Sequence, residues 1–75
     1  MIINYLEELP ENEMAVGYDI RRKITEDGVI ALKILNTRQL KGKLWEIKFS
    51  QNRIMYIVQD GEIIYFLHAC KNTEE

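Results

Sequence analysis

Cysteine, proline and long hydrophobic runs are scarce in this sequence of 75 residues. The single cysteine, Cys70, cannot form an internal disulfide, which agrees with a reducing compartment and favours a cytoplasmic protein. No apolar run approaches the length of about 18 residues that a membrane-spanning helix requires. Met1 is not followed by a basic segment and a small-residue cleavage site, so we expect no signal peptide.

Metal-ligating residues are also sparse, with one histidine and one cysteine among scattered carboxylates. They do not follow the spacing of a zinc or calcium site, so we expect neither a metal nor a cofactor. The hydrophobic content of 47% argues against disorder. The length predicts a single small domain that covers residues 1–75.

Charge is divided unevenly along the chain, although the net charge is only −2. Residues 1–20 contain five acidic residues and no basic residue. Residues 21–71 contain all ten lysines and arginines against five acidic residues. This division leaves two interpretations open, an ordinary solvated surface or a basic region that binds an anionic partner such as nucleic acid.

Hydrophobic spacing predicts two helices in the first 28 residues. The first helix should end before Pro10, because the residue that precedes a proline avoids the helical conformation. The second helix is predicted over residues 11–28, with Gly28 as its C-terminal cap. The predicted apolar faces carry Ile2, Ile3, Leu6 and Leu9 in the first helix and Val16, Ile20 and Ile24 in the second. The short connection between the helices predicts an antiparallel helical hairpin.

Beyond residue 28 the pattern changes. Residues 29–42, "VIALKILNTRQLKG", are compatible with a helical turn, an extended segment or both. From Lys43 the period becomes two, which predicts strands at Lys43–Phe49, Arg53–Gln59 and Glu62–Ala69. The sequence therefore predicts an α+β fold in which an N-terminal helical hairpin packs on one face of a three-stranded antiparallel sheet.

The turn chemistry predicts which residues face each other in this sheet. Asp60-Gly61 suits a two-residue hairpin turn, and that turn would place Arg53 directly opposite His68. Directly opposed residues in a sheet have Cβ atoms about 4.5–5.5 Å apart. Two interpretations of this pair remain open, a functional site and an ordinary solvated pair near the strand ends.

The first predicted strand can be tested against the same faces. A Gln51-Asn52 turn, or a loop from Ser50 to Arg53, would bury the apolar residues of this strand, whereas a three-residue loop would expose them. Burial favours the first register, which places Glu46 and Lys48 on the face of Arg53 and His68. Trp45 is interpreted as a core residue rather than as a stacking platform, and Cys70 as a small, partly buried hydrophobic residue rather than as a nucleophile.

Four stretches, "YLEELPE", "LKGKLWEIKF", "NRIMYIV" and "DGEIIYFLHACKNT", occur in this order over roughly residues 3–73. Together they resemble the HigB-like branch of the RelE superfamily, which comprises phage-derived toxins of toxin–antitoxin pairs. The resemblance implies a metal-independent endoribonuclease that cleaves mRNA, commonly on the translating ribosome. It also implies a cognate antitoxin as partner.

The resemblance further implies roles for individual residues. Arg53 matches the arginine of the family's middle strand, where a guanidinium suits a bidentate phosphate contact. His68 matches a histidine of the family's last strand, which leaves two roles open, proton transfer near neutral pH and a structural role. Glu46 would orient the cations. The implied catalytic residues are Arg53, His68 and Lys71, and the implied RNA-binding residues are Lys41, Lys43, Lys48, Arg21 and Arg22.

The chain departs from the family pattern at both ends. Family members usually begin with a strand before the first helix, so the RelE-like sheet predicted here lacks its first strand and has an exposed edge. The tail reads "KNTEE", with Asn72 at the position of a second lysine, and the family's terminal acid–base residue has no counterpart. Three alternatives follow: an active nuclease toxin, a non-catalytic remnant that binds an antitoxin or itself, and a phage structural or regulatory protein.

Overall fold

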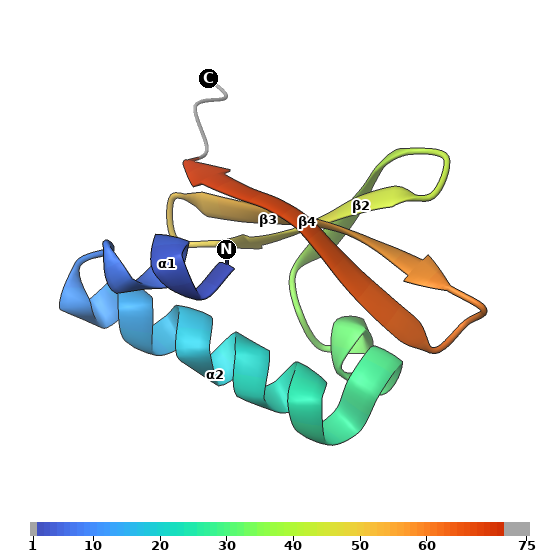
Figure 1. The fold of residues 1–75 in the computed structure, drawn as a ribbon, viewed down its shortest axis with the longest axis horizontal. Helices are drawn as coiled ribbons and strands as arrows, with labels where there is room; N and C mark the ends of the chain where they lie inside the picture. Colours follow the sequence, from blue (N-terminus) through green and yellow to red (C-terminus); the bar gives the residue numbers. More distant parts are fainter. Residues whose placement is uncertain (1, 72–75) are drawn as a thin grey trace.

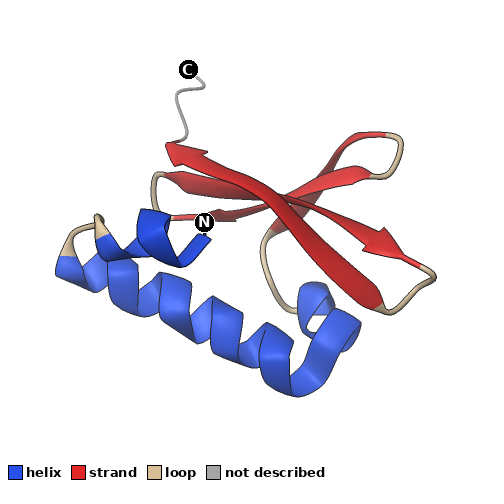
Figure 2. Ribbon diagram, viewed as in Figure 1, coloured by secondary structure: helices blue, strands red, loops and turns tan. Residues whose placement is uncertain are grey.

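The computed structural model describes residues 2–71 and the side chains of residues 4–71. Helical elements come first in the chain and strands follow. The elements are α1 (Ile2–Glu7), α2 (Glu11–Asp27), the 3-10 helix η1 (Gly28–Lys33), β1 (Thr37–Lys41), β2 (Leu44–Phe49), β3 (Asn52–Gln59) and β4 (Ile63–Lys71). The strands form one antiparallel sheet in the order β1-β2-β3-β4. The helices all lie on one side of this sheet (Figures 1 and 2).

The predicted architecture, a helical hairpin on a three-stranded sheet, is wrong. The sheet has a fourth strand, because residues 37–41 of the ambiguous connection pair with β2 as β1. The N-terminal segment is a short helix of six residues rather than one arm of a hairpin of comparable helices. The predicted second helix corresponds to α2, which begins at Glu11 and ends one residue before Gly28.

Helix α2 lies against the sheet along a stripe of small and aliphatic residues. Its buried residues Gly17, Ile20 and Ile24 recur every three or four positions, which places them on one helical face. The helix ends where Gly28 adopts a φ of 63°, and the Gly28 N–H donates to the Ile24 carbonyl. Glycine reaches a positive φ without the steric cost that a Cβ imposes, so it suits this position.

The loop between β3 and β4 is one residue longer than predicted. Gln59 pairs with Ile63, and residues 60–62 form a three-residue loop in which the Glu62 N–H donates to the Gln59 carbonyl. This shift turns Ile64 and Phe66 toward the helices. Turn composition did not reveal it, because "IIYFL" is apolar on both faces of the strand. Three large residues of β4 stay exposed: Ile63, Tyr65 and Leu67.

A β-bulge at Leu67 then shifts the register of β3 and β4 a second time. As a result, Met55 pairs with His68, and Arg53 pairs with Cys70. The predicted direct opposition of Arg53 and His68 is therefore wrong. They are diagonal neighbours on one face, a relationship that separates Cα atoms by about 7–8 Å.

The predicted faces of β2 are confirmed, although the turn that leads to β3 differs. Phe49 pairs with Asn52, so the turn consists of Ser50 and Gln51 instead of either predicted loop. Ile47 and Phe49 face the helices and are buried. Glu46 and Lys48 share the opposite face with Arg53, as predicted. We call this surface, which the helices leave uncovered, the open face.

Candidate functional site

The open face carries two cross-strand rows of side chains that the sheet register aligns. The first row runs from β1 to β4, and the second row lies beside it on β2, β3 and β4. The first row is Arg38, Glu46, Met55 and His68, and the second is Lys48, Arg53 and Cys70. Adjacent strands lie about 4.8 Å apart, so the rows bring cations from three strands next to one carboxylate.

Glu46 forms the centre of this arrangement. Its side chain is fully buried, although it belongs to the open face, because two guanidinium groups cover it. Arg53 Nε donates a hydrogen bond of 2.6 Å to Glu46 Oε1. Arg38 Nη2 lies 2.8 Å from Glu46 Oε2. A buried carboxylate is tolerated when it is compensated in this way.

The two oxygens of Glu46 are not equivalent. Oε1 accepts a well-formed hydrogen bond from Arg53, whereas Oε2 has an ion-pair distance to Arg38 but no hydrogen bond of acceptable geometry. The short distance establishes charge compensation, because electrostatic attraction depends less on direction than hydrogen bonding does. Arg53 is therefore held in a defined orientation, and Arg38 mainly compensates charge.

The Arg53 side chain is about one-fifth exposed, at 21%. Within residues 4–71, its polar contact is made by Nε, and no partner is found for its two terminal nitrogens. A guanidinium fixed through Nε presents these nitrogens in a planar fork that matches two phosphate oxygens. Lys48 pairs with Arg53 across β2 and β3 and adds a second positive charge beside it.

The structure places His68 near this group but not against Arg53. His68 is exposed and lies opposite Met55, at the β4 end of the first row. Cys70 takes the position that was predicted for the histidine, directly across from Arg53. Cys70 is only partly buried and belongs to the second row of the open face.

Lys71 lies apart from the other predicted catalytic residues. It pairs with Asn52, whose side chain points toward the helices and is fully buried. Lys71 Nζ lies 3.8 Å from Glu13 Oε1 of α2. The same carboxylate oxygen accepts a 2.8 Å hydrogen bond from Asn52 Nδ2, and Tyr5 donates to Asn52 Oδ1 at 2.6 Å. This network joins the sheet to α1 and α2.

Burial raises the pKa of two tyrosines between the helices and the sheet, Tyr5 of α1 and Tyr56 of β3. The pKa of Tyr5 is raised first by desolvation and further by the nearness of Cys70 and Glu13. The pKa of Tyr56 is raised by desolvation, and a hydrogen bond with Thr37 opposes this effect. Both phenols are therefore held in their neutral form, as hydrogen-bonding groups of the core.

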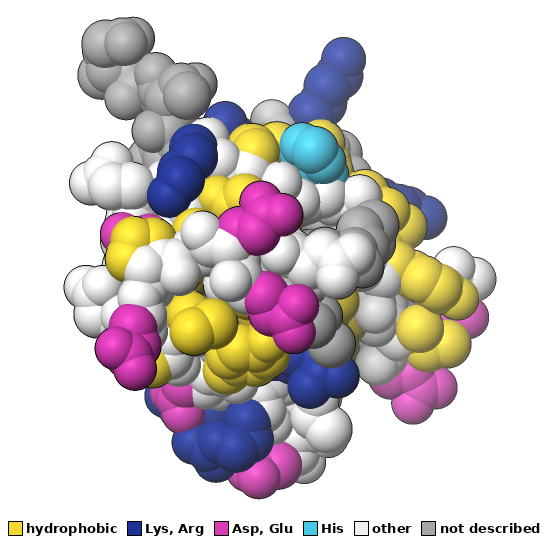
Figure 3. Space-filling view, turned by 60° about the vertical axis from the view of Figure 1, so that its left-hand side comes forward, with side chains coloured by type: hydrophobic (Ala, Val, Ile, Leu, Met, Phe, Trp, Pro, Cys, Tyr) yellow, Lys and Arg dark blue, Asp and Glu magenta, His cyan; other side chains and the backbone are white. Residues whose placement is uncertain are grey.

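The predicted RNA-binding residues do not form one surface. Arg21 and Arg22 belong to α2, on the helical side of the sheet. Arg22 is engaged by Asp19 at 2.5 Å, and hydrogen bonds from Lys23 and Arg22 lower the pKa of Asp19. Lys41 and Lys43 flank the tip of the β1–β2 hairpin. In the view of Figure 3, basic side chains lie in separate groups between acidic ones.

Sequence reasoning missed Arg38, the second cation on Glu46. Its strand lies in the stretch for which helical and extended structures were both left open, so no face could be assigned to it. The pairing of Arg38 with Glu46 follows only from the β1–β2 register. Lys48 helps to fix that register, because its N–H donates to the Asn36 carbonyl at 2.9 Å.

The described part of the chain contains neither a metal-binding cluster nor a membrane-spanning helix. Residues 2–71 contain no group of three or more histidine, cysteine or acidic side chains arranged to hold a metal ion. Over the same residues, no helix is both long and apolar enough to cross a membrane.

Comparison with known proteins adds one finding. The sequence profile of the family described as "Phage derived protein Gp49-like (DUF891)" matches residues 4–75 of the chain. No curated protein and no solved structure gives a significant match. The match covers nearly the whole sequence, including both rows of the open face.

Proposed function

Because the chain belongs to the phage-derived Gp49-like family, a family of the toxin–antitoxin type, we propose that it is the toxin of such a pair and cleaves mRNA. In this proposal it is a HigB-like, metal-independent endoribonuclease that acts in the cytoplasm in association with the ribosome. A cognate antitoxin neutralises it. The domain spans residues 1–75.

The observation that carries this proposal is the fixed guanidinium of Arg53. Buried Glu46 holds Arg53 Nε, the Arg53 side chain is partly exposed, and Lys48 is paired with Arg53 across the two strands. An RNA backbone carries one negative charge per phosphate, and binding to it depends on lysine and arginine. The open face thus supports contact with a phosphodiester better than the mixed charges of α2 do.

The proposed chemistry is attack of a ribose 2′-OH on the adjacent phosphate, which forms a 2′,3′-cyclic phosphate and breaks the bond from phosphorus to the 5′ oxygen. The 2′-OH loses its proton, and the leaving 5′ oxygen gains one. Arg53 and Lys48 stabilise the negative charge that develops on the phosphorane oxygens. His68, a diagonal neighbour of Arg53, transfers a proton to or from the reacting oxygens. Glu46 acts indirectly, because it orients Arg53, and Arg38 compensates the charge of Glu46. Lys71 has no catalytic role in this proposal, because its Nζ lies 3.8 Å from Glu13 Oε1 of α2.

A coupled translation reaction tests this function. Cleavage of a defined mRNA is mapped by primer extension for the wild-type protein and for Arg53→Ala. Lys23→Ala, which removes a cation of α2 that pairs with Asp19, is the matched control. Circular dichroism establishes that all three proteins are folded. We expect cuts with the wild type and Lys23→Ala but not with Arg53→Ala. Equal cleavage by folded Arg53→Ala contradicts the proposed site.

A second candidate function is a non-catalytic binding module that pairs with an antitoxin or with itself. The observation that favours it is β4, which lies at the edge of the sheet and exposes Ile63, Tyr65 and Leu67. An unpaired strand edge with apolar residues can accept another strand. Absence of cleavage together with a concentration-dependent increase in mass in light scattering would support this second function.

A further inference from the structure

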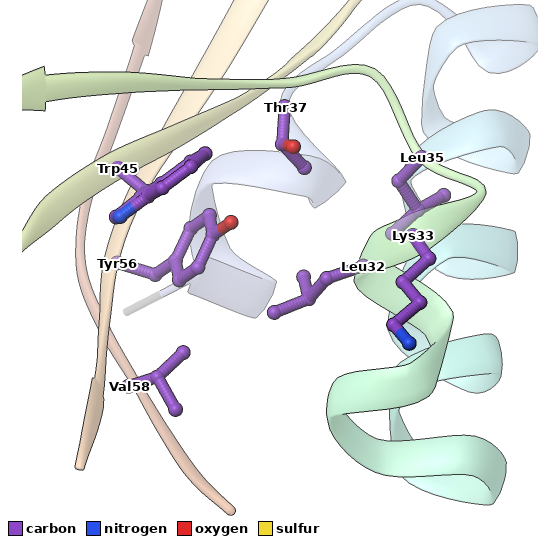
Figure 4. A pocket seen from close by; sticks show the side chains of 7 residues that line it. All are labelled: Leu32, Lys33, Leu35, Thr37, Trp45, Tyr56 and Val58. Carbon is purple, nitrogen blue, oxygen red and sulfur yellow. The ribbon is translucent and has the colours of Figure 1, made fainter. Parts of the chain in front are cut away.

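An apolar groove opens on the helical side of the sheet, away from Arg53. Trp45, Tyr56 and Val58 form the wall on the side of the sheet. Leu32 of η1 and Leu35, two residues after η1, form the opposite wall (Figure 4). Its volume is about 450 Å³, within the range of about 300–1,000 Å³ that is typical of binding pockets.

The groove exists because the helices cover only part of the sheet. Near the Phe49 end of β2 the sheet is covered, and Ile47, Phe49 and Ile54 are buried there. Toward the other end of β2, η1 and the residues directly after it face the sheet across the groove, and Trp45 remains partly exposed. Tyr56 closes the floor and is itself 2% exposed.

The surroundings of the groove are apolar and basic. One basic residue, Lys33, is exposed and lines the groove on the η1 side, and no acidic residue is among the residues that line it. Ile30 and Ile34, in and directly after η1, are 66% and 71% exposed. Large exposed apolar side chains in the segment that forms one wall of the groove favour a peptide or protein partner over a small molecule.

We propose that this groove binds an acidic amphipathic peptide segment of the partner antitoxin. Apolar side chains of that segment insert between Leu32, Trp45 and Val58, and its carboxylates lie near Lys33. The antitoxin identity of the partner rests on the proposed function, whereas the chemistry of the segment rests on the groove. In protein–protein interfaces, a few aromatic residues in apolar pockets contribute most of the binding free energy, and charged residues at the rim favour partners of opposite charge.

The chain itself provides the probe for this proposal, because Trp45 is its single tryptophan. Two synthetic 15-residue amphipathic peptides are compared, with identical leucines at helical spacing and with glutamate or lysine at every polar position. Binding is followed by Trp45 fluorescence and located by backbone amide chemical shifts. We expect saturable binding of the glutamate peptide, with shifts at Leu32, Lys33 and Trp45, and at least about tenfold weaker binding of the lysine peptide.

Charge-reversal variants test the role of the rim. Lys33→Glu, at an exposed position, should weaken binding of the glutamate peptide about fivefold or more. Lys23→Glu on α2 is the matched control and should bind like the wild type. Equal binding of both peptides, no binding of either, or shifts confined to β4 would overturn the proposal. Concentration-dependent self-association with shifts in the groove would overturn it as well, since the occupant would then be a second copy.

The groove and the open face lie on opposite sides of the sheet, so the two proposals fail separately. Arg53→Ala should abolish cleavage and leave binding of the glutamate peptide unchanged. Lys33→Glu should weaken peptide binding and leave cleavage unchanged. Cleavage without peptide binding refutes the groove proposal alone, and peptide binding without cleavage refutes the nuclease alone.

Discussion

Arg53 Nε donates a 2.6 Å hydrogen bond to Oε1 of Glu46, whose side chain is fully buried on the face of the sheet that the helices leave open. Arg38 covers the other carboxylate oxygen. The carboxylate therefore connects β1, β2 and β3 and fixes the cation proposed to contact phosphate. Stability and orientation of the site depend on the same residue.

Glu46→Gln should destabilise the protein by about 1–3 kcal/mol, because the substitution removes a buried charge that two guanidinium groups compensate. The amide oxygen can still accept from Arg53, which limits the loss. Urea denaturation measures the change in the free energy of unfolding. Glu62→Gln, in the exposed β3–β4 loop, is the matched control and should be neutral. An increase in stability would mean that desolvation of the Glu46 carboxylate costs more free energy than its contacts with Arg38 and Arg53 contribute.

Engineered disulfides test the register of β3 and β4. Arg53→Cys should form an intramolecular disulfide with Cys70 on mild oxidation, because directly paired strand positions lie within the Cα separation of about 4.4–6.8 Å that a disulfide spans. With Cys70 replaced by serine, Met55→Cys/His68→Cys should crosslink more readily than Arg53→Cys/His68→Cys. Mass spectrometry under non-reducing conditions distinguishes the products. The reverse order would support the register expected from a two-residue turn.

Stability should decrease in alkaline solution because of Tyr5 and Tyr56. Their raised pKa values mean that the folded protein holds the phenolic protons more tightly than the unfolded chain does. The stabilisation is present below about pH 10, the ordinary tyrosine pKa, and is lost as the pH rises through the folded values. Thermal unfolding from pH 8 to 11 measures this slope. Tyr56→Phe should flatten it, whereas Tyr65→Phe, at an exposed position, should leave it as steep as in the wild type.

Gly17→Ala should destabilise the protein despite the higher helix propensity of alanine. A Cβ at residue 17 would collide with Cδ2 of Leu6, which is fully buried. Overpacking costs about 1–3 kcal/mol and the propensity gain is about 1 kcal/mol, so we expect a net loss of up to about 2 kcal/mol. Shortening the opposing side chain in Gly17→Ala/Leu6→Val should restore part of it. A Gly17→Ala variant more stable than the wild type would show that α1 can move away from the added methyl group without loss of stability.

The predictable parts of this fold are those with a clear period or a strong terminator. Pro10 and Gly28 bracket α2, and the alternation of residues 44–49 assigned the faces of β2 correctly. Strand β1 was missed because "TRQLK" has no apolar alternation, and it becomes a strand only by pairing with β2. Without β1, the contact of Arg38 with Glu46 could not be foreseen.

The error in the candidate site has a different cause. Residues 63–67 are apolar without interruption, so burial could not distinguish the two registers, and the bulge at Leu67 left no signal in composition. Sequence placed Arg53, Glu46 and Lys48 on one face correctly, because β2 and β3 alternate clearly. It could not place His68 within β4, nor could it show that Lys71 is directed toward Glu13.

The most direct test of the proposed phosphodiester site is the chemical nature of the ends it generates. RNA fragments from a translation reaction with wild-type protein, Arg53→Ala or Lys23→Ala are analysed by mass spectrometry. The account predicts 2′,3′-cyclic phosphate and 5′-hydroxyl ends with the wild type and Lys23→Ala, reduced at least about 100-fold in Arg53→Ala. Fragments with 5′-phosphate ends, or equal amounts of cyclic phosphate from folded Arg53→Ala, would contradict it.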